Sequence, residues 1–325
     1  MKEIYTARLK QFSRQNNSVL PTPVHKLAFL CSGSGPSVYC KRDDLTGFGL
    51  GGNKTRKLDF LVADALSHGC DTLIGTGANQ SNFCRLAAAY GTTAGMQVHL
   101  VLGGEEPGRP TGNLLLDHLL GASCHDVSSC NWKDWLAEAA SLKERFSRQG
   151  LKPYLMPVGG STPIGALGYV DAFLEIIEDQ KRLGVTFDVI IHASSSAGTQ
   201  AGLIVGKELA GWKGRIIGIS AAKPAEEMKQ DVLSLAAETA ETFSCSISKE
   251  NVIVDDSQLG EGYGVKTPGC AEAVSLFARH GGIYLDYVYT GKAAAGLCAF
   301  LHRKYFPGDT TILFIHTGGT VQLFA

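Results

Sequence analysis

The sequence lacks several motifs that identify large protein classes. It has no Cys-x-x-Cys pair, and its nine cysteines are an odd number scattered along the chain, which favours reduced thiols over disulfides or a zinc site. None of its nine histidines is paired at metal-ligand spacing, so we expect no metal site. A Gly-x-Ser-x-Gly turn is also missing, which leaves an acyl-transfer triad without support.

Charge and hydrophobicity exclude two further classes. The 30 Lys and Arg residues nearly balance the 31 Asp and Glu residues, giving a net charge of −1. This balance argues against nucleic acid or an anionic membrane as the main partner. No apolar run approaches the length of a membrane span, and residues 1–18 lack the apolar core of a signal peptide. We therefore expect a cytoplasmic protein.

The sequence does contain a regular alternation of apolar runs and amphipathic segments, from the apolar run 71–77 to the final run 311–319. Near-continuous apolar strands separated by helices indicate an α/β protein with mainly parallel sheets. A chain of 325 residues with 44% hydrophobic content is long enough for two lobes. Ligands bind at the carboxyl ends of such strands. Four loops with unusual composition are expected there: 51–54, 75–82, 194–202 and 316–319.

Lys54 stands at the start of an expected helix, in the segment GLGGNKTRKLDFL (49–61). The helix macrodipole disfavours a cation at this end. The apolar positions Leu58, Leu61 and Val62 form the one-sided stripe of a packed helix. Lys54 is therefore either a solvated side chain or an amine whose chemistry is required at this point.

The other loops each allow a structural and a functional interpretation. Residues 195–199 either form a capped strand–helix turn or bind a phosphate through backbone N–H groups and hydroxyls. This loop has neither a Walker lysine nor a Gly-x-Gly-x-x-Gly, which favours a phosphate monoester over a nucleotide. Ser81 and Asn82 either cap the next helix or bind a substrate carboxylate at its start.

A lysine near a phosphate-binding helix start suggests one cofactor, pyridoxal phosphate. It needs an amine for a Schiff base, a phosphate site, and a hydroxyl or carboxylate for its pyridine nitrogen. Tyr263, Tyr287 and Tyr289 lie near glycines, and His316 follows an apolar run. Taken alone, each of these four residues is also consistent with simple packing in the core.

Together these segments resemble the family of D-cysteine desulfhydrase and 1-aminocyclopropane-1-carboxylate (ACC) deaminase, which are tryptophan-synthase-β-like pyridoxal-phosphate enzymes of fold type II. The resemblance extends from residue 20 to the C-terminus, through KRDDLTG, GGNKTRKLDFLVADAL, QSN, GALGYV, SAGTQAGL, GEGYG and HTGG. It implies two open, mainly parallel sheet domains and a homodimer. The large cofactor-binding domain would comprise residues 1–52 and 162–325, and the small inserted domain residues 53–161.

The resemblance also implies a role for individual residues. Lys54 matches the lysine that forms the Schiff base with pyridoxal phosphate, and Asn53 matches the residue that bonds the cofactor's 3′-oxygen. The phosphate site matches Ser195, Ser196, Ala197, Gly198 and Thr199. The substrate-binding segment matches Asn79, Gln80, Ser81 and Asn82. The catalytic positions match Lys54, Ser81, Tyr263 and Tyr289.

Two threonines distinguish the branches of this family. ACC deaminases have a glutamate at the position of Thr290 and a leucine at the position of Thr317, whereas D-cysteine desulfhydrases have threonines. A neutral hydroxyl leaves the pyridine nitrogen less protonated than a carboxylate does, and the cofactor is then a shallower electron sink. Such a sink suits elimination of a good leaving group, such as thiolate or sulfite. Either Thr290 or Thr317 could bond the nitrogen.

The resemblance thus implies a lyase that performs α,β-elimination on D-cysteine and yields pyruvate, ammonia and hydrogen sulfide. Three positions depart from the usual family pattern: Tyr287, Lys266 and Asn79. Lys266 would suit an anionic side chain, and GEGYG and HASSSAGTQAGL also resemble L-cysteate sulfo-lyase, which releases sulfite. L-Cysteate sulfo-lyase, ACC deaminase and a non-catalytic pyridoxal-phosphate-binding protein therefore remain alternatives.

Overall fold

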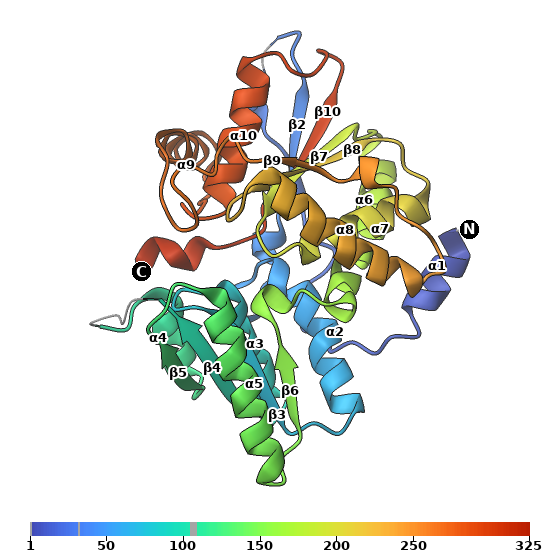
Figure 1. Cartoon of the computed structure of the whole chain (residues 1–325). Helices are drawn as coiled ribbons and strands as arrows, with labels where there is room; N and C mark the ends of the chain where they lie inside the picture. The colour runs from blue at the N-terminus through green and yellow to red at the C-terminus, as the bar shows by residue number, and fades with distance from the viewer. Residues whose placement is uncertain (1, 32, 105–108) are drawn as a thin grey trace.

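The computed structural model describes residues 2–31, 33–104 and 109–325, which contain two sheets (Figure 1). The strand order in the larger sheet is β1 (Val24–Lys26), β2 (Ser37–Lys41), β10 (Thr311–Ile315), β7 (Val189–Ser194), β8 (Arg215–Ser220), β9 (Ile253–Asp255). In the smaller sheet it is β5 (Ser123–Val127), β4 (Gln97–Gly103), β3 (Thr72–Ala78), β6 (Pro153–Met156). Every pair is parallel except β1 with β2. The predicted α/β class with mainly parallel sheets is confirmed.

Helices cover both faces of the six-stranded sheet. Those on one face are α6 (Pro163–Leu183), α7 (Gly198–Ala210) and α8 (Ala225–Glu241), and those on the other are α9 (Pro268–Gly281) and α10 (Thr290–His302). Ile190 of β7 packs in the first core and its neighbour Ile191 in the second. Because side chains alternate across a strand, a sheet covered on both faces requires continuous apolar strands.

The four-stranded sheet is layered in the same way. Its helices are α2 (Asn53–Ser67), α3 (Asn82–Thr93), α4 (Gly112–Leu119) and α5 (Trp132–Arg148). Leu73 of β3 packs with α2 and α3, whereas the next residue, Ile74, packs with α5. Helix α2 also contacts α6 of the larger sheet, so it joins the two halves of the molecule.

The chain before Lys54 contains elements that the alternation of apolar runs does not predict. They are α1 (Lys2–Leu9), β1, β2 and the 3-10 turns η1 (Ala28–Leu30), η2 (Asp43–Leu45) and η3 (Phe48–Leu50). Strand β1 has three residues and pairs antiparallel at the sheet edge, so it is too short for a periodic pattern. The later 3-10 turns are η4 (Val158–Gly160), η5 (Lys249–Asn251) and η6 (Thr320–Phe324).

Among the described residues, no helix has the length and apolarity needed to cross a membrane. All nine cysteines are free thiols. Cys40, Cys84 and Cys270 are buried, whereas Cys130 is exposed and lies at the cavity described next.

Candidate active site

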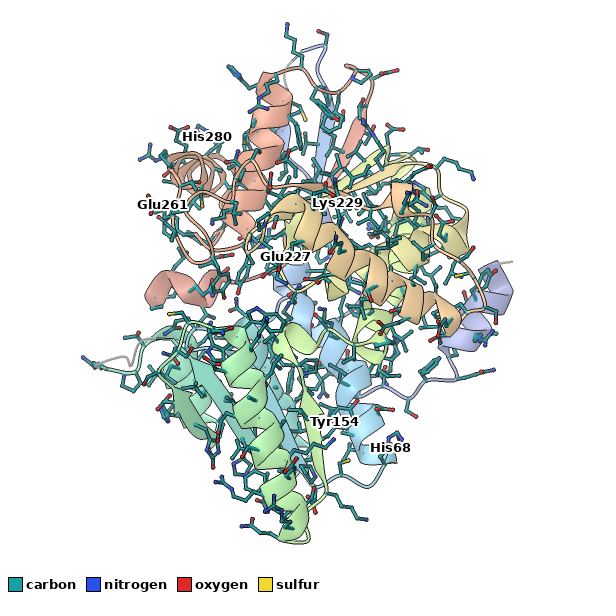
Figure 2. All side chains as sticks on the ribbon, in the orientation of Figure 1. His68, Tyr154, Glu227, Lys229, Glu261 and His280 are labelled. Atoms are coloured by element: carbon teal, nitrogen blue, oxygen red, sulfur yellow. The ribbon has the colours of Figure 1, made fainter. Side chains whose placement is uncertain are left out.

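A cavity of about 690 Å³ lies where strand ends of both sheets meet. Its lining includes the ends of β3 and β6 from the smaller sheet and of β7 and β10 from the larger one, as expected for parallel sheets. Glu227 of α8 also lines it and lies between the two sheets in Figure 2. The predicted residues that it brings together are Asn53, Lys54, Ser81, Asn82, Ser195, Ser196, Ala197, Thr199, Tyr263, Tyr289 and Thr317.

Lys54 is the second residue of α2 and is partly buried, with its amine directed to the cavity. A Cβ atom placed on Gly159 would lie 3.5 Å from Lys54 Nζ, so the amine faces bare backbone. Burial lowers the pKa of Lys54 to about 8. A substantial fraction of the amine is therefore neutral near physiological pH, which is the form that attacks a carbonyl or removes a proton.

The loop between β7 and α7 has the backbone geometry of an anion site. Ala197 adopts a positive φ of 65°, which is uncommon outside glycine and marks a backbone held by its surroundings. Helix α7 begins at Gly198 without a side-chain cap, so its first N–H groups have no intrahelical partner. The Asn53 amide donates to Thr199 Oγ1 at 2.9 Å, which leaves the Thr199 hydroxyl proton available to a ligand.

Lys57 is a buried amine that our sequence analysis missed. Its Nζ donates to the Gly159 carbonyl at 3.1 Å, and a Cβ on Gly198 would lie 2.5 Å from Nζ. Burial, followed by the nearby positive charge of Lys54, lowers the pKa of Lys57 well below its usual value. Its spacing of three residues from Lys54 places both amines on one helix face, which is the signal that could have identified it.

Ser81 combines both roles that the sequence allowed. It is the N-cap of α3, and its Oγ accepts a hydrogen bond from the Cys84 N–H at 3.2 Å. A hydroxyl that accepts in this way keeps its own proton for donation. Because Ser81 also lines the cavity, capping and chemistry are compatible.

Asn79 and Gln80 are not among the described residues that line the cavity. The Gln80 side chain is directed to the start of α4, where it donates to the Thr111 carbonyl and accepts from the Asn113 N–H. Gln80 therefore supports the loop through its amide group. Asn82 lines the cavity beside Ser81.

Tyr263 and Tyr289 meet at their hydroxyl groups, whose oxygens lie 2.5 Å apart. The Tyr263 ring is 41% exposed at the surface, whereas its hydroxyl is directed inward. Burial raises the pKa of both phenols, and that of Tyr289 is raised well above its usual value. Both tyrosines are therefore protonated at neutral pH, so the pair can donate a proton.

Thr317 and Thr290 occupy different environments. Thr317 lines the cavity and its carbonyl accepts from the Asn53 N–H at 2.9 Å. Thr290 is fully buried, and its hydroxyl donates to Asp286 Oδ2 at 2.6 Å while accepting from the Asp286 N–H at 2.9 Å. Thr290 is not among the described lining residues. Its hydroxyl proton is already donated to Asp286.

His316 is a core histidine within a hydrogen-bonded turn. Its Nδ1 accepts from the Gly318 N–H, and its Nε2 lies 3.1 Å from the Tyr284 carbonyl. Burial lowers its pKa. These contacts account for His316 as a packing residue of the core.

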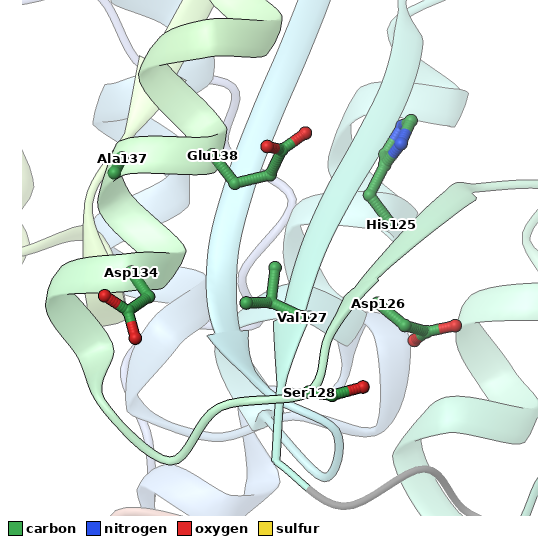
Figure 3. Close-up of a pocket in the computed structure, with 7 residues that line it drawn as sticks. All are labelled: His125, Asp126, Val127, Ser128, Asp134, Ala137 and Glu138. Atoms are coloured by element: carbon green, nitrogen blue, oxygen red, sulfur yellow. The ribbon is translucent and has the colours of Figure 1, made fainter.

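A second hollow lies on the smaller sheet, between β5 and α5. Figure 3 shows His125 and Glu138 on its opposite sides, and His125 also lies 3.0 Å from His99 through their ring nitrogens. Within the described ranges, no group of three His, Cys, Asp or Glu side chains is arranged to hold a metal ion. The cavity between the sheets is therefore the candidate active site.

The cavity fits a ligand with one phosphate and one carbonyl group. Ser161 Oγ and Ser194 Oγ are buried there without a hydrogen-bond partner among the described residues. Gly159 has a φ of 68°, and a Cβ added to it would lie 2.2 Å from Ser196 Oγ. A glycine at this position therefore leaves room beside it for Ser196 or for a ligand. Free hydroxyls, a helix start and two buried amines are the donor set that a phosphorylated aldehyde requires.

Known proteins that are similar to this chain include enzymes of pyridoxal phosphate, which is a phosphorylated aldehyde. A family model described as "Pyridoxal-phosphate dependent enzyme" matches residues 16–318. The D-cysteine desulfhydrase of Yersinia enterocolitica is 41% identical over 324 residues, covering 98% of this chain and 97% of that protein. The protein of the same name from Salmonella typhi is 40% identical over the same shares.

Solved structures that are similar to this chain belong to the same family or share its fold. The crystal structure of an ACC deaminase homologue is 37% identical and superposes with a TM-score of 0.91, covering 98% of this chain and 95% of that one. A fungal L-serine ammonia-lyase from Rhizomucor miehei is 17% identical with a TM-score of 0.69 and covers 94% of each chain, so it shares the fold. The chain therefore belongs to the pyridoxal-phosphate-dependent enzymes and, within them, to the family of D-cysteine desulfhydrase and ACC deaminase.

Proposed function

We propose that the protein is a D-cysteine desulfhydrase. It breaks the bond between Cβ and sulfur and removes the Cα proton, and the released aminoacrylate hydrolyses to pyruvate and ammonia. The sulfur leaves as hydrogen sulfide. The observation that supports this choice within the family is the neutral hydroxyl of Thr317 in the cavity lining, with no carboxylate at Thr290. A neutral partner suits elimination of a good leaving group better than it suits ring opening.

The cofactor is held by residues on one side of the cavity. Bound pyridoxal phosphate withdraws electron density from the substrate Cα. Residues 195–199 would bind its phosphate at the start of α7, and Lys57 would place an amine beneath that loop, whose protonated form a bound phosphate favours. Asn53 would hold the 3′-oxygen, and the Thr317 hydroxyl would bond the pyridine nitrogen.

The chemistry is performed by residues around the cofactor. Lys54 would hold the cofactor through its amine and, once free, would take the Cα proton of the substrate, for which its lowered pKa suits it. Ser81 and Asn82 bind the substrate carboxylate at the start of α3. The hydroxyl pair of Tyr263 and Tyr289 donates a proton to the departing sulfur.

The position of Lys266 favours a thiol over a sulfonate leaving group. Lys266, which could have paired with an anionic side chain, places its Nζ 4.1 Å from the centre of the Tyr287 ring and is not among the described lining residues. Glu227, Asp231 and Glu238 also line the cavity, and Lys223 of the same lining pairs with Glu227 at 3.0 Å and with Asp231 at 2.6 Å. Two of these three carboxylates are therefore paired with a cation, and the choice of leaving group rests on Lys266.

We further propose that residues 53–161 form the small domain, that residues 1–52 and 162–325 form the large domain, and that the protein is a cytoplasmic homodimer. The smaller sheet spans 72–156, and nine free thiols suit a reducing compartment. Light scattering after size exclusion tests the dimer, because a single species at 34.5 kDa would contradict it.

The decisive assay offers D-cysteine, L-cysteine, L-cysteate and ACC to the purified enzyme. Sulfide, sulfite and 2-oxo acid are measured separately for each compound. We expect equimolar sulfide and pyruvate from D-cysteine, at the highest kcat/KM of the four. ACC turnover at a comparable rate, or sulfite from cysteate, would overturn the substrate assignment.

A further inference from the structure

The C-terminal turn η6 connects the two halves of the molecule across the cavity. After β10 of the larger sheet, the chain passes Thr317 and Gly319 in the cavity lining and ends beside α4 of the smaller sheet. Figure 1 shows this last turn above the labelled helix α4. The contact is close, since a Cβ on Gly112, the first residue of α4, would lie 3.1 Å from Ala325 Cβ.

Within this contact, a side chain of the turn holds the loop that contains Ser81. Gln322 Nε2 donates to the Gln80 carbonyl at 2.9 Å. Asn113 Nδ2 donates to the same oxygen at 2.9 Å and to Asn82 Oδ1 at 3.0 Å. The carbonyl of the peptide immediately before Ser81 is thus held from both halves of the molecule.

The orientation of the Gln322 amide is determined by its partner. A flipped amide would place its oxygen against the Gln80 carbonyl oxygen, which is repulsive. Gln322 Oε1 is buried without a hydrogen-bond partner in the part of the chain that the structure describes. The bond to Gln80 is therefore the polar contact that the side chain contributes here.

We propose that Gln322 is a positioning residue for the substrate. Because a peptide is planar, holding the Gln80 carbonyl fixes the direction in which Ser81 leaves the loop and enters the cavity. Gln322 follows Thr317 by five residues, so the same bond ties the position of the substrate carboxylate site to the residue that meets the cofactor ring. The proposal rests on the proposed binding of the substrate carboxylate by Ser81 and Asn82.

Removal of this single hydrogen bond should act on substrate binding. In Gln322→Leu, the Gln80 carbonyl keeps its bond from Asn113, so the loop loosens without losing all support. A neutral hydrogen bond of this kind corresponds to about a 3- to 10-fold effect. We expect KM for the amino-acid substrate to rise by that factor, with kcat and the visible absorption of the bound cofactor unchanged.

Hydrogen–deuterium exchange of the cofactor-loaded protein tests the tie without any substrate. Amides in residues 78–84 should exchange about 3- to 10-fold faster in Gln322→Leu than in the parent. Phe324→Ala is the matched control, because Phe324 lies in the same turn but is 74% exposed. Unchanged exchange in Gln322→Leu, or equal acceleration in Phe324→Ala, would overturn the proposal even if the enzyme acts on no sulfur amino acid.

Gln322→Glu separates positioning from packing. A protonated glutamate can donate to the Gln80 carbonyl, whereas an ionised one is repelled by it. Because a glutamate ordinarily titrates near pH 4.3 and burial raises that value, the KM ratio of variant to parent should rise as pH increases from about 5 to 8. The ratio for Gln322→Leu should stay flat. A flat ratio in both variants would contradict a hydrogen-bonding role.

Discussion

Helices α7 and α3 both begin at the cavity, and their starts differ in ways that match different anions. Helix α7 starts after Ala197 without a side-chain cap and with Lys57 beneath it. Helix α3 starts at Ser81, whose hydroxyl caps the Cys84 N–H, and the buried Arg85 in its first turn donates to the Gly51 carbonyl. An uncapped start with a buried amine beside it suits a phosphate dianion, whereas a half-capped start suits a carboxylate.

The difference between α7 and α3 shows that the helix dipole alone does not define an anion site. Both helix starts offer free N–H groups, but the groups around them set the charge that can be bound and whether it stays bound. At α7 the backbone is constrained by sterics, since neither Gly198 nor Gly159 has room for a Cβ. At α3 the loop is held by side-chain amides, from Asn113 and Gln322. Substitutions that alter one start and leave the other intact can test this difference.

The largest effect should follow from removing the amine that lies between the two helix starts. Lys54→Ala should lower turnover by about 10⁴-fold, because it removes both the covalent attachment and the base. Borohydride should fix the cofactor to Lys54 in the parent and to no residue in the variant. Lys229→Ala is the control, since Lys229 is on the surface of α8 and pairs with Glu226 (Figure 2). An unchanged visible spectrum in Lys54→Ala would contradict the assignment of Lys54 as the residue that binds the cofactor covalently.

The next effect concerns the start of α3. Ser81→Ala should lower kcat/KM about 10²- to 10³-fold through loss of a hydroxyl at the reacting region. The start of α7 is untouched, so the affinity for the cofactor should be that of the parent. Equilibrium dialysis of pyridoxal phosphate and steady-state kinetics with D-cysteine measure the two quantities. A variant as active as the parent would show that Ser81 serves α3 only as a cap.

Replacing the amine beneath α7 should have the opposite pattern. Lys57→Met keeps the length and apolar stem of the side chain but removes an amine whose protonated form a bound phosphate favours. The dissociation constant of pyridoxal phosphate should rise about 10- to 100-fold, the range expected for a charged hydrogen bond. At saturating cofactor, KM for D-cysteine should stay near the parent value. A rise in KM without loss of cofactor affinity would place Lys57 at the substrate instead.

Lys57 also shows where sequence reasoning reached its limit. The strand–helix order and the cavity loops follow from periodicity and from local composition, whereas the role of Lys54 follows from the family resemblance. The structure places these loops together. The role of Lys57 depends on Gly159 and Gly198, which are distant in sequence and approach its amine only in the folded chain. Likewise, Thr290 follows two tyrosines and Thr317 precedes two glycines, and burial against Asp286 distinguishes the two threonines only in three dimensions.

A pH series should show the lowered pKa of Lys54 directly. The amine attacks the cofactor aldehyde only when neutral, and burial lowers its pKa to about 8. The neutral fraction therefore grows about tenfold between pH 7 and pH 9. Stopped-flow absorbance of apoprotein mixed with pyridoxal phosphate should show the attachment rate rising by that factor, with a midpoint near pH 8. A midpoint above pH 10 would mean that Lys54 is solvated like an ordinary surface lysine.

The smallest effect should separate the two threonines. Thr317→Val removes one neutral hydroxyl from the cavity lining while keeping the shape of the side chain. We expect kcat to fall about 3- to 10-fold, with an unchanged melting temperature, because no other described group depends on that hydroxyl.

Thr290→Val should act on stability instead. Its hydroxyl bonds the buried Asp286 carboxylate at 2.6 Å, and losing a hydrogen bond to a charged group costs about 1.5–3 kcal/mol. The carboxylate retains donors from the Val288, Tyr289 and Thr290 N–H groups, so we expect a folded protein that melts a few degrees lower, with kcat near that of the parent. Differential scanning calorimetry and steady-state kinetics on both variants decide the matter. If Thr290→Val lowers kcat more than Thr317→Val at an unchanged melting temperature, then Thr290 meets the pyridine nitrogen, and its bond to Asp286 must open when the cofactor binds.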